Sequence, residues 1–234
     1  MLFNAIIMRK WKLLIAGIIA FSDIGAQWER AQVIDKKIKS TTVSYWLEDS
    51  SKQIIVKTIF SVNGDDSLIY DNGELSFSYK SKFGEKGKVV RVERYDHLNR
   101  LDEIHMYEYD VNGSYTIEII AQGAGTILFS KYDKNHKCLQ QEFSGVETLF
   151  YEYNDSGYLS KMMYARKKDI AVEIAKVIVD AEGNMESIIG IGEVASTTSF
   201  KYNHLGLISE MARVVKSKDG SETKQIAYYT YELR

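Results

Sequence analysis

The chain has 234 residues, a hydrophobic fraction of 45%, a charged fraction of 26% and a formal net charge of −2, a composition that excludes extended disorder. It contains 16 tyrosines and no proline, and because tyrosine favours strands and proline is excluded from central strands, both deviations predict an all-β fold. There is no arginine-rich run, so nucleic acid is not expected as a partner.

The first 26 residues are predicted to be a secretory signal peptide. A positive segment at residues 9–12 precedes the uninterrupted apolar run Leu13–Phe21, and Ala26 offers a small residue at the cleavage site, with either Met1 or Met8 as the start. The apolar run is much shorter than the ~20 residues of a membrane-spanning helix, which favours a cleaved signal over an anchor. We therefore expect an exported protein, periplasmic or extracellular, that does not span the membrane after cleavage.

Residues 27–69 are expected to lead into the same sheet as the rest of the chain. Residues 27–39 form either a short amphipathic helix or an irregular lead-in, residues 53–62 alternate as in a strand, and residues 63–66 (Asn-Gly-Asp-Asp) favour a turn. Residues 70–234 are expected to form the main β domain.

A short pattern recurs along that domain: aromatic, any residue, tyrosine, Asp or Asn, two residues, glycine, any residue, apolar. The clearest copies begin at Tyr107, Tyr151 and Phe200, and weaker copies place their tyrosine position at 83, 95, 132 and 179. An Asp or Asn side chain can hydrogen-bond the backbone of a turn, and glycine supplies the positive φ that closes it. Each copy therefore predicts a hairpin turn.

The spacing of the copies predicts how the hairpins follow one another. From 83 to 95 to 109 the steps of 12 and 14 residues fit one strand each, and the later steps of 21 to 26 fit a full hairpin. Segment 169–179 carries helix-favouring residues, but its β-branched content and its place in the repeat favour a strand. The pattern predicts an antiparallel meander of hairpins that forms one long, twisted or curled sheet and ends in a strand at 228–233. Return turns are expected near 123–125, 144–145, 167–169, 190–192 and 219–220.

These motifs resemble the YD-repeat family, also called RHS repeats, whose mark is a Tyr-Asp pair followed by glycine and an apolar residue. The resemblance covers about residues 83–213 and implies an extended, curling β-sheet, which in large toxins of that family encloses a cargo. Few copies here keep the full Tyr-Asp-x-x-Gly, and their spacing is uneven. The resemblance therefore implies a fold and adds little about function.

Residues with reactive side chains form no recognisable catalytic motif, so we expect neither an enzyme nor a cofactor. Cys138 is the only cysteine, which excludes an internal disulfide, and it is expected to be a half-buried apolar residue. His97, His105, His136 and His204 lack the paired spacing of a metal site and are expected to be solvated turn residues. Turn chemistry explains the Asp- and Asn-rich turns without calcium.

Five tyrosines form a predicted aromatic stripe, which is the main functional indication: Tyr107, Tyr109, Tyr151, Tyr153 and Tyr202. Exposed aromatic rings on a sheet can stack on sugars or bind proteins, whereas half-buried rings would be cross-strand ladders, which the alternation of the repeat favours. The leading hypothesis is a non-catalytic scaffold or interaction protein of the bacterial envelope, whose partner is another envelope or secreted protein or a glycan. The alternative is a carbohydrate- or lipid-binding carrier with a tyrosine-lined cleft.

Overall fold

The computed structural model describes most of the chain from residue 33 to the C-terminus. The predicted signal peptide, most of segment 27–39 and most of the turn expected at 63–66 lie outside the described residues. The described residues are 33, 36–46, 53–61, 66–155, 157–167, 169–191, 195–217 and 219–234.

Within these residues the chain forms sixteen β-strands and one short 3₁₀ helix, η1 (Glu85–Gly87). The strands are β1 (Ile38–Trp46), β2 (Gln53–Phe60), β3 (Asp66–Asp71), β4 (Glu74–Phe83), β5 (Val89–Asp96), β6 (Leu101–Tyr109), β7 (Tyr115–Ala121), β8 (Gly125–Tyr132), β9 (Cys138–Phe143), β10 (Glu147–Tyr153), β11 (Leu159–Arg166), β12 (Val172–Val179), β13 (Met185–Gly190), β14 (Ala195–Tyr202), β15 (Ile208–Lys216) and β16 (Glu222–Leu233). Strands therefore occupy the positions predicted at 53–62, 169–179 and 228–233.

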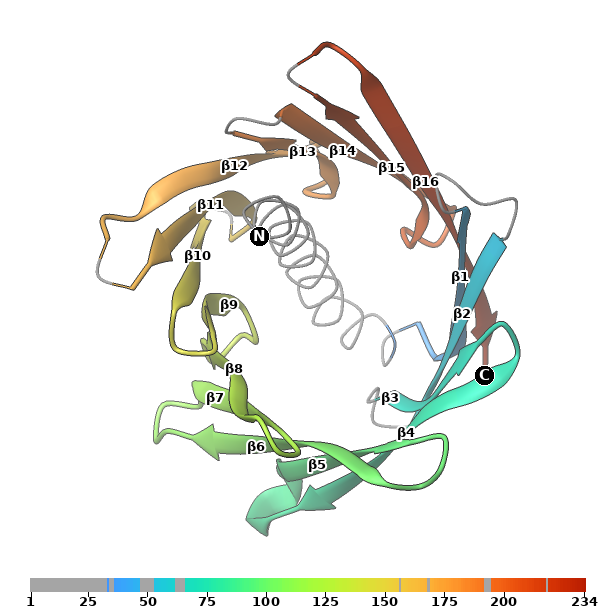
Figure 1. Ribbon diagram of the computed structural model, residues 1–234, viewed down its shortest axis with the longest axis vertical. Coiled ribbons are helices and arrows are strands. Elements are labelled where there is room, and N and C mark those ends of the chain that lie inside the picture. The colour runs from blue at the N-terminus through green and yellow to red at the C-terminus, as the bar shows by residue number, and fades with distance from the viewer. Residues whose placement is uncertain are drawn as a thin grey trace, which may run out of the picture.

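The sixteen strands follow one another around a closed barrel, each antiparallel to the next (Figure 1). The barrel closes where β1 pairs with β16, from Ser40 opposite Glu232 to Tyr45 opposite Ala227. The antiparallel all-β meander of hairpins is confirmed, and the sheet predicted to be long and twisted or curled is in fact closed into a barrel. Closure removes the two unpaired edge strands that an open sheet would expose.

The hairpin turns alternate between the two ends of the barrel, because every strand reverses direction. The turns after β4, β6, β8, β10, β12 and β14 lie at one end, here called the repeat end, and the turns after β5, β7, β9, β11, β13 and β15 lie at the other. The tyrosine position at 95 thus lies opposite those at 83 and 109, which confirms one strand per step there. From 109 onward each step is a hairpin, and the return turns lie at the predicted places.

The repeat turns are closed by a side-chain oxygen. Oδ1 of Asp110 accepts hydrogen bonds from the backbone N–H groups of Asn112 and Ser114 at 2.8 and 2.9 Å, and Gly113 adopts a φ of 90°. In the copies without glycine, Asn99 and His136 hold the positive φ, at 59° and 64°. The predicted turn chemistry is confirmed. The same acceptor role is played by Asp96, Asp133, Asn154, Asp180 and Asn203.

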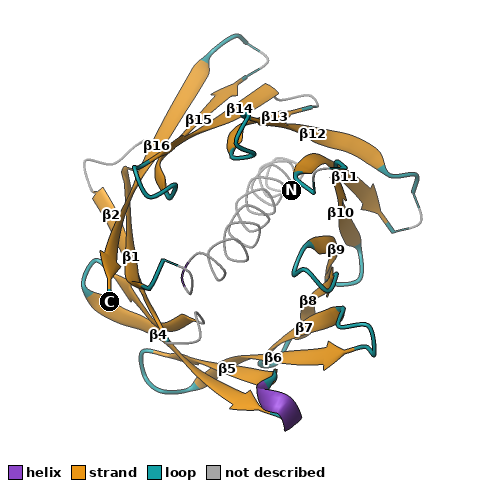
Figure 2. Ribbon diagram, turned by 180° about the vertical axis from the view of Figure 1, so that it is seen from behind, coloured by secondary structure: helices purple, strands orange, loops and turns teal. Residues whose placement is uncertain are grey.

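Alternation along the strands gives the barrel two different faces. On one face side chains such as Tyr151, Met162 and Ile188 are almost fully buried. We assign this face to the inside, because a closed sheet crowds the side chains on its concave surface, and we call it the inner wall. Several turns also bend toward the barrel axis (Figure 2).

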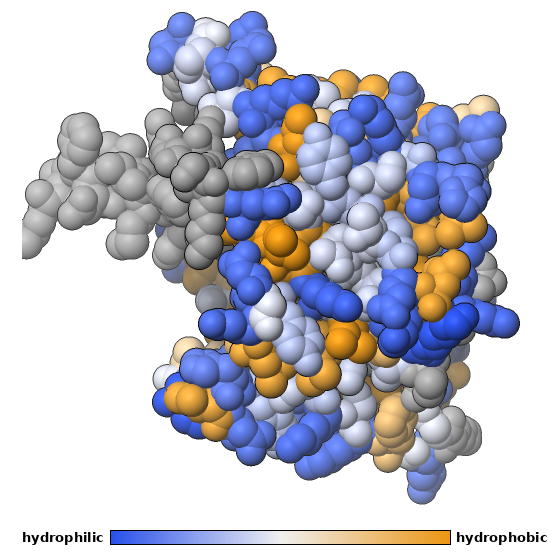
Figure 3. All heavy atoms as spheres, turned by 90° about the vertical axis from the view of Figure 1, so that its right-hand side faces the viewer, coloured by the Kyte–Doolittle hydropathy of each residue, from blue (hydrophilic) through white to orange (hydrophobic). Residues whose placement is uncertain are grey.

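The opposite face is the outside of the barrel and is rich in charged side chains. Ion pairs join neighbouring strands there, such as Glu152–Lys161 at 2.7 Å and Lys201–Glu210 at 2.9 Å. Figure 3 views the barrel from the side, and hydrophilic side chains are interspersed with apolar ones over the surface it shows. No continuous apolar band is visible on that side.

Replacing Asp133 tests the side-chain oxygen that closes the turns. Asp133→Ala removes the acceptor for the N–H groups of Asn135 and Lys137 and should lower the free energy of unfolding by about 1 kcal/mol. Asp133→Asn should cost little, because Asn154 and Asn203 perform the same role elsewhere. Urea unfolding of both variants measures the difference, and an equal loss in both would contradict this account of the turn.

Candidate functional site

The five tyrosines of the predicted stripe all lie on the inner wall. Tyr107 and Tyr109 come from β6, Tyr151 and Tyr153 from β10, and Tyr202 from β14. The first four belong to one hydrophobic cluster, in which Tyr151 is buried and the others pack partly buried around it. The structure thus gathers the stripe on one surface, with Tyr202 beside the cluster.

Two further tyrosines, outside the predicted stripe, stand at the centre of this cluster. The rings of Tyr115 and Tyr132 stack with centroids 4.8 Å apart, and the ring of Tyr109 lies 5.4 Å from that of Tyr115. Nδ1 of His136 lies 3.2 Å from the hydroxyl of Tyr115. Both tyrosines occupy repeat positions, so the repeat itself was the signal that marked them. The stacking supports cross-strand ladders as the main role of these rings.

Tyrosine hydroxyls also join successive repeats at the repeat end. Tyr153 donates to the carbonyl of Cys138 at 2.8 Å, and Tyr202 donates to the carbonyl of Met185 at 2.9 Å. Each acceptor lies six residues after the tyrosine position of the preceding copy. Burial raises the pKa of Tyr202 to about 12, and the nearby Asp180 carboxylate adds to the shift. Each hairpin is therefore fastened to the one before it.

A polar group occupies the inner wall on the other side of the cluster. Nη2 of Arg94 lies 2.7 Å from Oε1 of Glu103, and the guanidinium also bonds Asp102 and lies 4.5 Å above the ring of Phe77. Burial lowers the pKa of Arg94, but the hydrogen bond to Asp102 and the charge of Glu103 outweigh it, so the pKa is raised. Nε2 of His105 lies 3.2 Å from Oε2 of Glu103.

The prediction that the four histidines are solvated turn residues is correct for three of them and wrong for one. His97, His136 and His204 are exposed in turns, whereas His105 is half-buried in β6 beside Glu103. The sequence assigned it with the turn residues because nothing local showed which face of the strand it occupies. Cys138 is buried, somewhat more deeply than expected.

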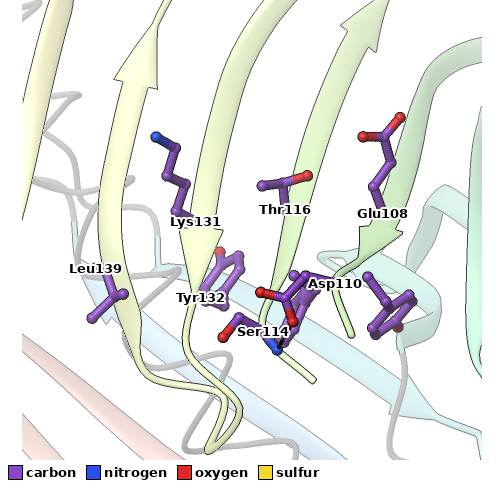
Figure 4. A pocket seen from close by; sticks show the side chains of 9 residues that line it. Glu108, Asp110, Ser114, Thr116, Lys131, Tyr132 and Leu139 are labelled. Carbon is purple, nitrogen blue, oxygen red and sulfur yellow. Dashed lines mark hydrogen bonds between the residues drawn. The ribbon is translucent and has the colours of Figure 1, made fainter. Parts of the chain in front are cut away.

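A pocket of about 370 Å³ lies at the repeat end of β6, β7 and β8. Glu108, Thr116 and Lys131 lie in a row across these strands, and Asp110 and Ser114 border the pocket at the turn (Figure 4). Tyr109, Tyr115, Tyr132 and Leu139 complete its lining. Its size is in the range expected for a carrier site, but Tyr115 and Tyr132 are buried, and Glu108, Thr116 and Lys131 lie on the outer face.

The described residues offer neither a metal-binding cluster nor a membrane-spanning helix. No group of three or more His, Cys, Asp or Glu side chains in this part of the chain is placed to hold a metal ion. No helix there is long and apolar enough to cross a membrane.

Comparison with known proteins finds solved structures whose backbones are distantly similar to this antiparallel barrel. No family model matches the sequence, and no curated protein matches it. A porin-like protein from Bacteroides uniformis is 9% identical, with 83% of this chain and 98% of that chain covered and a TM-score of 0.45. The TcdB2–TccC3–Cdc42 complex is 9% identical over 82% of this chain and 14% of that chain, with a TM-score of 0.31. A protein of unknown function from Bacteroides fragilis is 11% identical over 70% of this chain and 94% of that chain, with a TM-score of 0.23.

TM-scores and identities this low do not establish a shared fold or function. The YD-repeat resemblance therefore stays a prediction from the sequence motif, and the case for function depends on the geometry of this barrel.

Replacing Tyr202 by Phe tests the hydroxyl contact between repeats. At pH 7 the variant should lose about 1 kcal/mol of unfolding free energy, because the carbonyl of Met185 loses its donor. The neutral phenol of Tyr202 stabilises the fold fully below its unfolded pKa of about 10, and this contribution is lost as pH rises through about 12. The wild type should therefore lose stability more steeply across that interval than the variant.

Tyr228→Phe is the matched control, because Tyr228 is exposed on the outer face of the same barrel. Urea unfolding between pH 7 and 12 supplies the measurement. If Tyr202→Phe and Tyr228→Phe show the same pH profile, the contact does not stabilise the fold.

Proposed function

We propose that this protein is an exported, non-catalytic binding barrel of the bacterial envelope, which works in water and holds its partner against the inner wall. The observation that carries the proposal is the difference between the two faces of the closed sheet. The absence of enzymatic activity is proposed from the sequence, in which no catalytic motif occurs.

The outer face supports a barrel surrounded by water. Lysines occupy outer positions in strands all around the ring, including Lys57 in β2, Lys80 in β4, Lys131 in β8, Lys176 in β12 and Lys201 in β14. A lysine on the lipid face of a membrane barrel costs ~2–4 kcal/mol near the bilayer midplane. Such an outer face suits the periplasm or the extracellular medium better than the membrane itself.

The inner wall supports a binding role. Barrels of about sixteen strands have interiors wider than their own side chains fill. This inner wall combines an aromatic cluster on β6–β10 with the charged group of Arg94, Glu103 and His105 on β5 and β6. Aromatic rings next to hydrogen-bonding groups are the usual composition of protein-binding surfaces. We propose a segment of another envelope or secreted protein as the partner.

The pocket at the repeat end favours a second candidate, a small glycan or lipid ligand. Half-buried Tyr109 and exposed Leu139 supply apolar surface there, and Glu108 and Lys131 supply hydrogen-bonding groups at its rim. Stacking on tyrosine with polar groups at the edge is a common way to bind sugars.

Site-specific cross-linking separates an inner from an outer binding surface. Gln225 and Lys224 are adjacent exposed residues of β16, and their side chains lie on the inner and outer face respectively. A photo-cross-linking side chain at position 225, used in envelope extract, should give a discrete adduct that position 224 does not give. Mass spectrometry of the adduct distinguishes a protein from a glycan or lipid. Adducts at position 224 alone would contradict the proposal.

Partition between phases tests the water-facing exterior. The exported chain should remain in the aqueous phase of a Triton X-114 separation and should not float with liposomes, because its outer lysines would have to enter lipid. The double variant Glu152→Leu and Lys161→Leu, which removes one outer ion pair, should move toward the detergent phase. Recovery of the wild-type protein with the liposomes would show that the barrel is embedded in lipid.

A further inference from the structure

Two arginines of the inner wall, Arg94 on β5 and Arg213 on β15, have opposite surroundings. Arg94 bonds Asp102 and Glu103 and lies over the ring of Phe77. Nε of Arg213 is buried, yet it has no hydrogen-bond acceptor among the described residues, and none of their carboxylates forms an ion pair with this side chain. Burial alone accounts for a lowered pKa of Arg213. Arg94 is therefore paired with acids, whereas half-buried Arg213 keeps a buried N–H donor without an acceptor.

The strands around Arg213 place suitable neighbours beside it. Thr198 of β14 and Gln225 of β16 lie directly opposite Arg213 on the same face. One pair further toward the repeat end, Phe200 faces Met211, and both are half-buried. Hydrogen-bonding side chains thus flank the guanidinium across the strands, and apolar side chains lie next to it along the strands.

A buried guanidinium N–H without an acceptor costs free energy, so the position of Arg213 needs an explanation. Removing a charged group from water is unfavourable unless a partner of opposite charge or an acceptor replaces the water. Functional sites are where proteins retain such unfavourable groups. A guanidinium presents parallel N–H donors that fit the two oxygens of a carboxylate or a phosphate.

We propose that Arg213 is the anion-binding residue of a ligand site on the inner wall of β14–β16. The site takes the carboxylate or phosphate of an amphiphilic molecule, whose apolar part packs on Phe200 and Met211. Thr198 and Gln225 supply hydrogen bonds to the remaining oxygens. The proposal rests on the proposed function only in using the inner wall as the binding surface.

Ligand binding to the full-length exported protein tests the charge of the ligand. Decanoate and decyl phosphate, titrated below their critical micelle concentrations, should bind, and the uncharged decanol should bind much more weakly. Arg213→Gln should weaken binding of the anions by about tenfold to hundredfold, as expected for a charge-assisted hydrogen bond, and leave decanol unchanged. Lys224→Gln, which removes an outer cation from the neighbouring strand, is the matched control and should bind as the wild type does.

The two anions identify the head group, since preference for one shows whether the natural ligand carries a carboxylate or a phosphate. Equal binding of decanol and decanoate by the wild type, or unchanged anion binding by Arg213→Gln, would overturn the proposal. Cross-linking at position 225 reports any molecule bound near the inner wall, whatever its charge, so a protein partner found there would leave the proposed function standing while the anion site fails.

Stability without ligand supplies a second readout. Arg213→Met removes the buried, unsatisfied N–H donor and should raise the midpoint of thermal unfolding. Arg94→Met leaves Asp102 and Glu103 without their cation and should lower it. A fall of the midpoint in both variants would mean that Arg213 has a structural role, and it would contradict the proposed site.

Discussion

The pairing of β1 with β16 is the contact on which the rest of this barrel depends. An antiparallel meander has two edge strands whose N–H and C=O groups need partners. Here the first strand supplies the partner of the last, from Ser40 opposite Glu232 to Tyr45 opposite Ala227. Because the sheet is closed, it has one concave and one convex face, and every alternating position along the chain belongs to one of them. The distinction between the inner wall and the charged outer face follows from this closure.

The repeat builds the barrel through two hydrogen-bonding arrangements. An Asp or Asn oxygen closes each turn, as Asp110 does with the N–H groups of Asn112 and Ser114. A tyrosine hydroxyl then fastens a hairpin to its predecessor, as Tyr153 does with the carbonyl of Cys138. The copy at Val179 has no hydroxyl, so it keeps the turn and loses the fastening. Degenerate copies can therefore still continue the sheet, which is why uneven motifs give a regular barrel.

Charged side chains have different surroundings on the two faces of the barrel. On the outside, pairs such as Glu152 and Lys161 face water, where ion pairs contribute little to stability and keep the surface polar. On the inner wall Arg94 is compensated by two acids, whereas Arg213 has an orphaned Nε. The inner wall thus carries stacked tyrosines, one arginine paired with acids and one arginine with an unsatisfied N–H donor.

The sequence by itself determined the local structure, because a turn depends on the few residues that form it. The Asp or Asn, the glycine and the alternating tyrosines predicted the turns, the strands and the common face of Tyr151 and Tyr153. Only the tertiary structure decided that the sheet closes and that His105 and Arg213 lie on the inner wall. It also decided that Arg94 pairs with Asp102 and Glu103. The register between strands sets these relations, and no local pattern records which distant strand is the neighbour of another.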